Sequence, residues 1–346
     1  MSELVFELPT RPAIKSASTP CFDEVWLFRH CLLIQLSYLL PLSRTQADLR
    51  PRLLTLAQGK PIVIDSVTDP CAPEFVRNFL KKHSIDDIVT VLVNERDIGW
   101  PGFRWYPIWV LKAINQHLAS CYQVPDSHWH HRTRNLSCLN RMPKHHRFYT
   151  YYKLAQKSWF KDVYFSFGGY DPLKNITHPK NIKEYFTEEE NRWFDSQEAT
   201  WPVKHDDQYQ WPDSHGQHNP YTPAYRDCYA NLATETEVDT FCVTEKTTKN
   251  LHTGLIFFVV GAPDHMKKIH SWGFDLDYIG VDHSYDQIQD WRERINTVVN
   301  IVDKCYPQLP DIWHENLSKI QYNSQLFYST EFAANLLTDV SDLICL

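Results

Sequence analysis

The chain has 346 residues, which suits two domains of ordinary size or one large one, and its 43% apolar fraction is enough for a hydrophobic core. A net charge of −7 argues against a general polyanion binder, although it is compatible with a local basic groove. The nine cysteines are scattered without a C-x-x-C pair, as expected of reduced thiols in a cytosolic protein.

The longest apolar stretch near the N-terminus is Cys31–Leu40, which is too short to span a bilayer. We expect this stretch to form a buried helix. No basic segment followed by an apolar one precedes it, so we expect no signal peptide, a cytoplasmic location and no integral membrane contact.

The first third of the chain alternates between strand and helix patterns. The predicted elements are a helix over 49–56, a strand over 60–65, a helix over 73–83, a strand over 88–94 and a helix over 107–120. This alternation is typical of βαβ units and predicts an α/β domain with a parallel sheet.

A polar segment over 125–134 predicts a domain boundary, and a second α/β pattern follows it. Its predicted elements are strands over 135–140, 163–167 and 225–233, and helices over 147–157, 285–306 and within 311–335. The long polar and aromatic segment 172–217 is expected to contain short helices, since unstructured loops of this length are uncommon in compact domains.

The stretch from Phe241 to Pro263 carries the most functional information. The segment 244–252 predicts a helix capped by Thr244, and the apolar run that follows it, between Gly254 and Gly261, predicts a buried parallel strand. A helix N-terminus presents free N–H groups and a positive dipole end, so it can hold a diphosphate. Lysines at 246 and 249 on one helix face add charge, and glutamates at 235 and 245 can accept hydrogen bonds from sugar hydroxyls. These features together are what a nucleotide-sugar site requires.

The same stretch resembles the donor-binding half of GT-B glycosyltransferases. The motif Thr-Glu-Lys-x-x-Lys over 244–249, the strand, Gly-x-Pro over 261–263 and Gly-Phe at 273–274 are similar to the fucosyltransferase-like and exostosin-like group, and to glycosyltransferases of phages and marine bacteria. The resemblance extends over 138–147 and 282–286 and covers about residues 135–335. Where these families tend to have Ala-Gly at a helix end, this chain has His252-Thr253-Gly254, which leaves the donor sugar open.

The resemblance implies an α/β GT-B fold of two Rossmann-like domains whose parallel sheets face a central cleft. Residues 1–130 would form the acceptor-side domain and 131–320 the nucleotide-sugar domain, while 321–346 would form a helix that crosses back to the first domain. Ligands in such folds bind at the carboxyl ends of the strands.

Two groups of candidate site residues are predicted, from the resemblance and from the loops that follow the predicted strands. The candidate donor-binding residues are Asn140, Arg141, Lys144, Arg147, Glu235, Thr244, Glu245, Lys246 and Lys249, with Glu237 as the alternative to Glu235. One general base is needed to activate an acceptor hydroxyl, and the candidates are Asp65, Asp69, Glu95 and Asp97.

We expect no metal and no cofactor besides the nucleotide-sugar, because helix dipoles and cations carry the leaving-group charge in GT-B enzymes. Asp275-Leu-Asp277 matches a three-residue metal motif of the other large glycosyltransferase fold, but such short matches are common. The histidines at 128, 130, 131, 145, 146, 215 and 218 have no cysteine at ligand spacing.

The acceptor is the most open part of this hypothesis. A glycan is preferred, and the alternative is hydroxymethylated cytosine in DNA, as in phage-type DNA glycosyltransferases. In that case a basic face would contact phosphates, with Arg132, Arg134, Lys144, His145 and His146 as its candidate members. A third reading is a non-catalytic protein that binds a sugar nucleotide.

Overall fold

The computed structural model describes residues 25–27, 32–35, 48–59, 61–65, 73–93, 100–105, 132–140, 143–167, 182–197, 203–204, 222–329 and 331–332. The chain divides into two compact units, Met1–Ile108 with Leu336–Leu346, and Trp109–Asn335. The boundary expected at residue 130 falls outside the described residues, so it stays a prediction.

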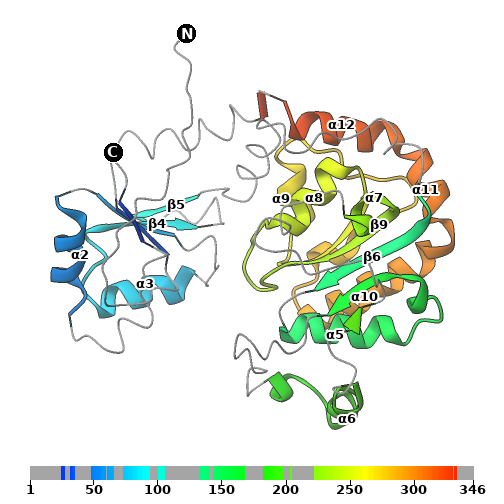
Figure 1. Cartoon of the computed structure of the whole chain (residues 1–346), viewed down its shortest axis with the longest axis horizontal. Helices are drawn as coiled ribbons and strands as arrows, with labels where there is room; N and C mark the ends of the chain where they lie inside the picture. Colours follow the sequence, from blue (N-terminus) through cyan, green and yellow to red (C-terminus); the bar gives the residue numbers. More distant parts are fainter. Residues whose placement is uncertain are drawn as a thin grey trace. The chain divides into compact units, whose positions relative to one another are not determined.

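The first unit is built on a five-stranded sheet with the strands in sequence order (Figure 1). The strands are β1 (Val25–Leu27), β2 (Leu32–Gln35), β3 (Ile62–Asp65), β4 (Val89–Val93) and β5 (Phe103–Trp105). Strand β1 is antiparallel to β2, and the other neighbours are parallel. The connecting helices are α2 (Arg50–Ala57) and α3 (Pro73–Lys82), whose apolar residues share one core with the strands.

The buried helix expected over 31–40 is wrong. The structure has strand β2 there, in which Leu33 and Ile34 pair with Trp26 and Val25 of β1 on one side and with β3 on the other. A short apolar run has no helical or strand periodicity of its own, so the partner strands decide its conformation.

The second unit contains another five-stranded sheet, in the order β10-β9-β6-β7-β8 (Figure 1). The strands are β6 (Arg134–Asn140), β7 (Tyr164–Phe167), β8 (Val203–Lys204), β9 (Cys228–Thr234) and β10 (Ile256–Val260). All neighbours are parallel except β8, which is antiparallel to β7. The expected α/β class, with a largely parallel sheet in each of two units, is confirmed.

Two pairs of packed helices flank this second sheet in the described part of the chain. Helix α5 (His145–Ala155) packs along α10 (Trp291–Cys305), and α8 (Glu245–Thr253) packs against α12 (Leu317–Phe327). The other described helices of the unit are η3 (Phe160–Asp162), η5 (Ile182–Tyr185), α6 (Glu188–Gln197), α7 (Pro223–Arg226), α9 (His265–His270), η8 (Ser284–Gln287), η9 (Tyr306–Gln308) and α11 (Leu309–Glu315). The expected short helices within 172–217 are therefore present as η5 and α6.

Two helix boundaries differ from the prediction. The helix expected from residue 285 begins at Trp291, because the Asp290 carboxylate caps it by accepting a 2.8 Å bond from the Glu293 amide. The last helix is interrupted at Asn316, whose side chain instead bonds to both backbone groups of Ile279. Since α12 packs on α8 within the second unit, the expected return of 321–346 to the first unit stays a prediction.

The order of the strands reverses between β6 and β9. From β6 the chain adds β7 and β8 on one side, and it then continues with β9 and β10 on the other. In open α/β sheets, ligands bind at the carboxyl ends of the strands where this reversal occurs. The carboxyl ends of β6 and β9 are therefore where a site is expected in this unit.

Candidate functional site

The site begins with the last residues of β6 and β9. Asn140 ends β6 and Thr234 ends β9, and the Thr234 hydroxyl donates to the Asn140 side-chain oxygen. Both residues are buried. This bond holds the two strand ends together directly beneath the loops that lead into α5 and α8.

The N-terminus of α8 is occupied by a carboxylate of the protein itself. Buried Glu235 accepts hydrogen bonds from the Thr244 amide (3.1 Å), the Thr244 hydroxyl (2.5 Å) and the Thr247 hydroxyl (2.5 Å). A negative charge is stabilised at this end of a helix by the dipole. Glu235, predicted as a ligand-binding residue, is therefore hydrogen-bonded to Thr244, the N-cap of α8, and to Thr247 in its first turn.

The predicted cap and cations of α8 lie as the sequence indicates. Thr244 is the N-cap and Gly254 ends the helix in a left-handed conformation with φ of 69°. The Lys246 ammonium lies 3.1 Å from a Glu245 carboxylate oxygen. Burial by itself would raise the pKa of the Glu245 carboxyl, but Lys246 and Lys249 lower it to about 2.

Lys249 differs from Lys246 because its charge lies in the interior. The side chain is 5% exposed and its ammonium lies 5.0 Å from the ring centroid of Tyr225. Within the described part of the chain this ammonium donates no hydrogen bond and forms no ion pair. Burial lowers the pKa of Lys249 to about 8, against the opposing effect of Glu245.

The N-terminus of α5 is open by comparison. Its N-cap residue, Lys144, makes no capping bond with its side chain, which instead forms an ion pair with Glu237. Each side chain of this pair is 31% exposed. Lys144 is thus a partly exposed cation at a helix N-terminus that its own side chain does not cap, and a helix N-terminus beside a cation favours binding of an anion.

Two buried residues of α5, Arg147 and His146, form hydrogen bonds to backbone carbonyl groups at the end of β9. The Arg147 guanidinium donates to the carbonyl oxygens of Thr234 (3.4 Å) and Glu235 (3.0 Å), and burial lowers its pKa. His146 Nε2 lies 2.9 Å from the Glu235 carbonyl and therefore carries the proton. Burial holds the pKa of His146 well below its usual value, so the ring is neutral at pH 7. Arg147 and His146 support the loop after β9.

An aromatic group at the same edge was not singled out by the sequence. His145 stacks on Tyr185 with ring centroids 4.4 Å apart, and it makes a T-shaped contact with Trp291, with ring centroids 4.9 Å apart. These rings come from α5, η5 and α10, which are far apart in the chain. The sequence could not predict this aromatic group, because its three residues come together only when the ends of α5, η5 and α10 meet in the folded chain.

Several predicted site residues cannot be placed in the same detail. Asp65 is the last residue of β3, at the carboxyl edge of the first sheet. Arg141, Asp69, Glu95 and Asp97 lie outside the described residues. The assignment of one of the four acids as general base therefore stays a prediction.

The Asp275-Leu-Asp277 segment is held by protein contacts. The Asp275 carboxylate lies 3.3 Å from the Lys319 ammonium and accepts a 3.2 Å bond from the Asp277 amide. Across the described ranges, no three His, Cys, Asp or Glu side chains gather in a way that would hold a metal ion.

The residues considered for DNA contacts are split between the interior and the surface. Arg132 is buried and donates to the carbonyl oxygens of Tyr225 and Cys228 and to those of Thr253 and Gly254. His146 is also buried. These two residues support the fold and do not line a phosphate-binding surface.

Comparisons with known proteins give distant structural likenesses only. No family model matches the chain, and no curated protein matches its sequence. An α,α-trehalose-phosphate synthase (UDP-forming) from Burkholderia vietnamiensis is similar, with 12% identity, a TM-score of 0.41 and coverage of 88% of this chain and 74% of that one. An α,α-trehalose 6-phosphate synthase from Burkholderia multivorans has 10% identity, a TM-score of 0.39 and coverage of 90% and 70%. Likenesses this weak carry no argument for what this chain does.

Among the described residues, no helix combines the length and apolar character needed to cross a membrane.

Proposed function

We propose that this chain is a metal-independent GT-B glycosyltransferase that transfers a sugar from a nucleotide-sugar to a hydroxyl group, with a glycan as acceptor. The observation that carries the proposal is the edge of the second sheet where β6 and β9 diverge. Two helix N-termini and the cations Lys144 and Lys246 meet the carboxyl ends of these strands there. This is the geometry that binds a diphosphate in open α/β sheets.

We place the diphosphate at the N-terminus of α5. The carboxylate of Glu235 already lies at the N-terminus of α8, and a second anion there would be repelled. The N-terminus of α5 has no side-chain cap, and Lys144 is partly exposed beside it. When the donor binds, Lys144 would exchange Glu237 for a phosphate oxygen and leave Glu237 free to accept from a sugar hydroxyl.

The chemistry that this site would supply is electrostatic. As the bond between the sugar and the diphosphate breaks, negative charge grows on the leaving group, and Lys144 with the N–H groups of α5 would stabilise it. Lys246 and Lys249 would add positive potential from α8. In this proposal one of the candidate acids Asp65, Asp69, Glu95 and Asp97 removes the proton from the acceptor hydroxyl.

Calorimetric titration with a panel of nucleotide-sugars tests the proposal. We expect one of them to bind, and Lys144→Ala to weaken it about ten- to a hundredfold, since a charge-assisted contact contributes ~1.5–3 kcal/mol. Lys246→Ala should weaken it less, because Lys246 is already paired with Glu245. Lys304→Ala is the control, since Lys304 is an exposed lysine of α10 in the same unit.

The outcomes separate the hypotheses. If Lys246→Ala loses more affinity for the nucleotide-sugar than Lys144→Ala does, the diphosphate binds at the N-terminus of α8 and not at that of α5. Binding without transfer or hydrolysis would favour the non-catalytic reading. If no nucleotide-sugar binds, or if all three variants behave alike, the donor site is not at this edge of the sheet.

A further inference from the structure

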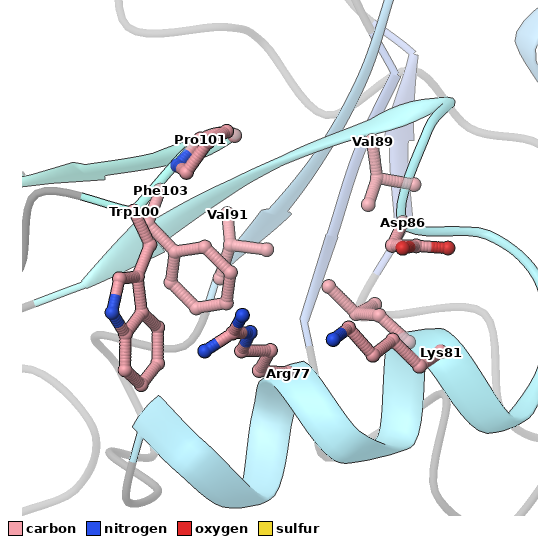
Figure 2. Close-up of a pocket in the computed structure, with 10 residues that line it drawn as sticks. Arg77, Lys81, Asp86, Val89, Val91, Trp100, Pro101 and Phe103 are labelled. Atoms are coloured by element: carbon pink, nitrogen blue, oxygen red, sulfur yellow. The ribbon is translucent and has the colours of Figure 1, made fainter.

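A hollow in the first unit lies between α3 and the strands β4 and β5 (Figure 2). Its floor is apolar and includes the buried side chains of Val89, Val91 and Phe103. Trp100 forms one wall and is set edge-on to Phe103, with ring centroids 5.5 Å apart. The hollow therefore offers apolar and aromatic surface to a small ligand.

Two cations project from α3 along the open side of this hollow. Arg77 and Lys81 are four residues apart on α3, so they lie on the same face of the helix. Figure 2 shows Arg77 beside Trp100, with Lys81 next along the helix and Asp86 beyond Lys81. The Arg77 guanidinium lies 4.7 Å from the ring centroid of Trp100.

Asp86 also lines the hollow, but in the described part of the chain it forms no ion pair with Arg77 or Lys81. Within the ranges that the structure describes, neither Arg77 nor Lys81 forms an ion pair or donates a hydrogen bond from its charged end. Elsewhere in the unit, Arg50 of α2 is paired with Asp87. Two neighbouring cations that form no ion pair repel each other, and an anion bound between them would offset this repulsion while gaining charge-assisted hydrogen bonds.

We propose that this hollow binds a small organic anion, with its phosphate or carboxylate between Arg77 and Lys81 and its apolar body against Trp100 and Phe103. Val89 begins β4 and Phe103 begins β5, so the hollow lies at the amino-terminal half of these strands. Candidate base Asp65 lies at the opposite, carboxyl end of the parallel neighbour β3. The hollow is thus a site apart from the proposed transfer chemistry and does not depend on it.

Calorimetry on the full chain with four probes tests this proposal: phenyl phosphate, benzoate, inorganic phosphate and phenol. We expect phenyl phosphate or benzoate to bind and phenol not to bind. The comparison of the first two probes identifies the anionic group. Inorganic phosphate should bind at least about tenfold more weakly than phenyl phosphate, because it lacks a body to lie on Trp100.

Three variants and a matched control decide whether binding occurs in the hollow. Arg77→Met and Lys81→Met keep apolar bulk but remove the charge, and each should weaken binding about tenfold or more. Trp100→Leu should weaken it through loss of the aromatic wall. Lys82→Met is the control, because Lys82 is the next lysine of α3 and does not line the hollow.

Thermal unfolding of each variant shows whether the fold is intact. The proposal is overturned if neither phenyl phosphate nor benzoate binds, or if folded Arg77→Met and Lys81→Met bind as the parent does. It is equally overturned if Lys82→Met loses as much affinity as they do. Nucleotide-sugar binding by Arg77→Met should equal that of the parent, so failure here leaves the donor site untouched.

Discussion

Glu235 is a buried carboxylate whose three hydrogen-bond donors all belong to the start of α8. We expect Glu235→Ala to lower the free energy of unfolding by about 2–4 kcal/mol, because it leaves those donors without a partner in the interior. Glu237→Ala should cost less than about 1 kcal/mol, since its ion pair with Lys144 is partly exposed.

Urea denaturation of both variants at pH 7 measures the difference. Equal stability of the two would show that the Glu235 carboxylate does not stabilise the start of α8, and Glu235 would again be a candidate for ligand binding.

Lys249 gives a prediction about pH. Its folded pKa of about 8 is below the ordinary lysine value of 10.5, so between these pH values the unfolded chain holds a proton that the folded chain has released. The stability contributed at this residue therefore rises with pH over that range and is lowest below pH 8. Lys249→Met removes this dependence, and the stability of the parent relative to the variant should rise by roughly 2 kcal/mol from pH 7 to pH 10.

Denaturant titrations of the parent and of Lys249→Met at pH 7 and pH 10 give the difference in stability between the two proteins at each pH, and the change in that difference is the predicted quantity. Other groups that titrate near pH 10 cancel in it. A difference that stays constant between pH 7 and pH 10 would mean that the Lys249 ammonium is solvated.

At the scale of elements, Asn316 joins the break between α11 and α12 to the loop over 271–283, which follows α9. Its side chain accepts from the Ile279 amide (2.7 Å) and donates to the carbonyl oxygens of Ile279 (2.9 Å) and Ile312 (2.8 Å). We expect Asn316→Ala to cost about 2–4 kcal/mol in urea denaturation, because the Asn316 side chain is buried and makes all three of these bonds. Ser318→Ala, at an exposed position two residues later, should change stability by less than about 0.5 kcal/mol.

Asp275 of the same loop forms an ion pair with Lys319 of α12, so its carboxylate already has a cationic partner within the protein. We expect sugar transfer to continue unchanged in a chelator. A complete loss that manganese restores would overturn the proposed metal-independent mechanism.

Elements with strong local signals were predicted from the sequence, and elements that depend on distant partners were not. Helix α8 has its cap at Thr244 and its stop at Gly254, and both signals are local. Strand β2 lacked such signals, and its pairing with β1 and β3 decided its form. In the candidate site, Thr244 and Lys246 were placed correctly on α8. The bond from Thr244 to Glu235 was missed because it spans nine residues and competes with the predicted ligand role.

At the scale of the whole molecule, the net charge of −7 favours a glycan over DNA as the acceptor. We expect a gel-shift titration to show no tight binding of plain or hydroxymethylcytosine-containing duplex at physiological salt. Binding of DNA through phosphates would weaken with salt, with a log–log slope near −0.9 for each phosphate neutralised. Tight, salt-sensitive binding with sugar transfer only to the modified duplex would show that the preferred acceptor is wrong.

Arg132 has a consequence for the kinetics of unfolding. Its guanidinium bonds to carbonyl groups on either side of the start of β9 and at the end of α8, roughly 90 to 120 positions further along the chain. These bonds can form only after the sheet has brought all three segments together, so they belong to a late stage of folding. Loss of late contacts accelerates unfolding more than it slows folding. Arg132→Met should therefore shorten the lifetime of the native state while refolding proceeds at nearly the parental rate.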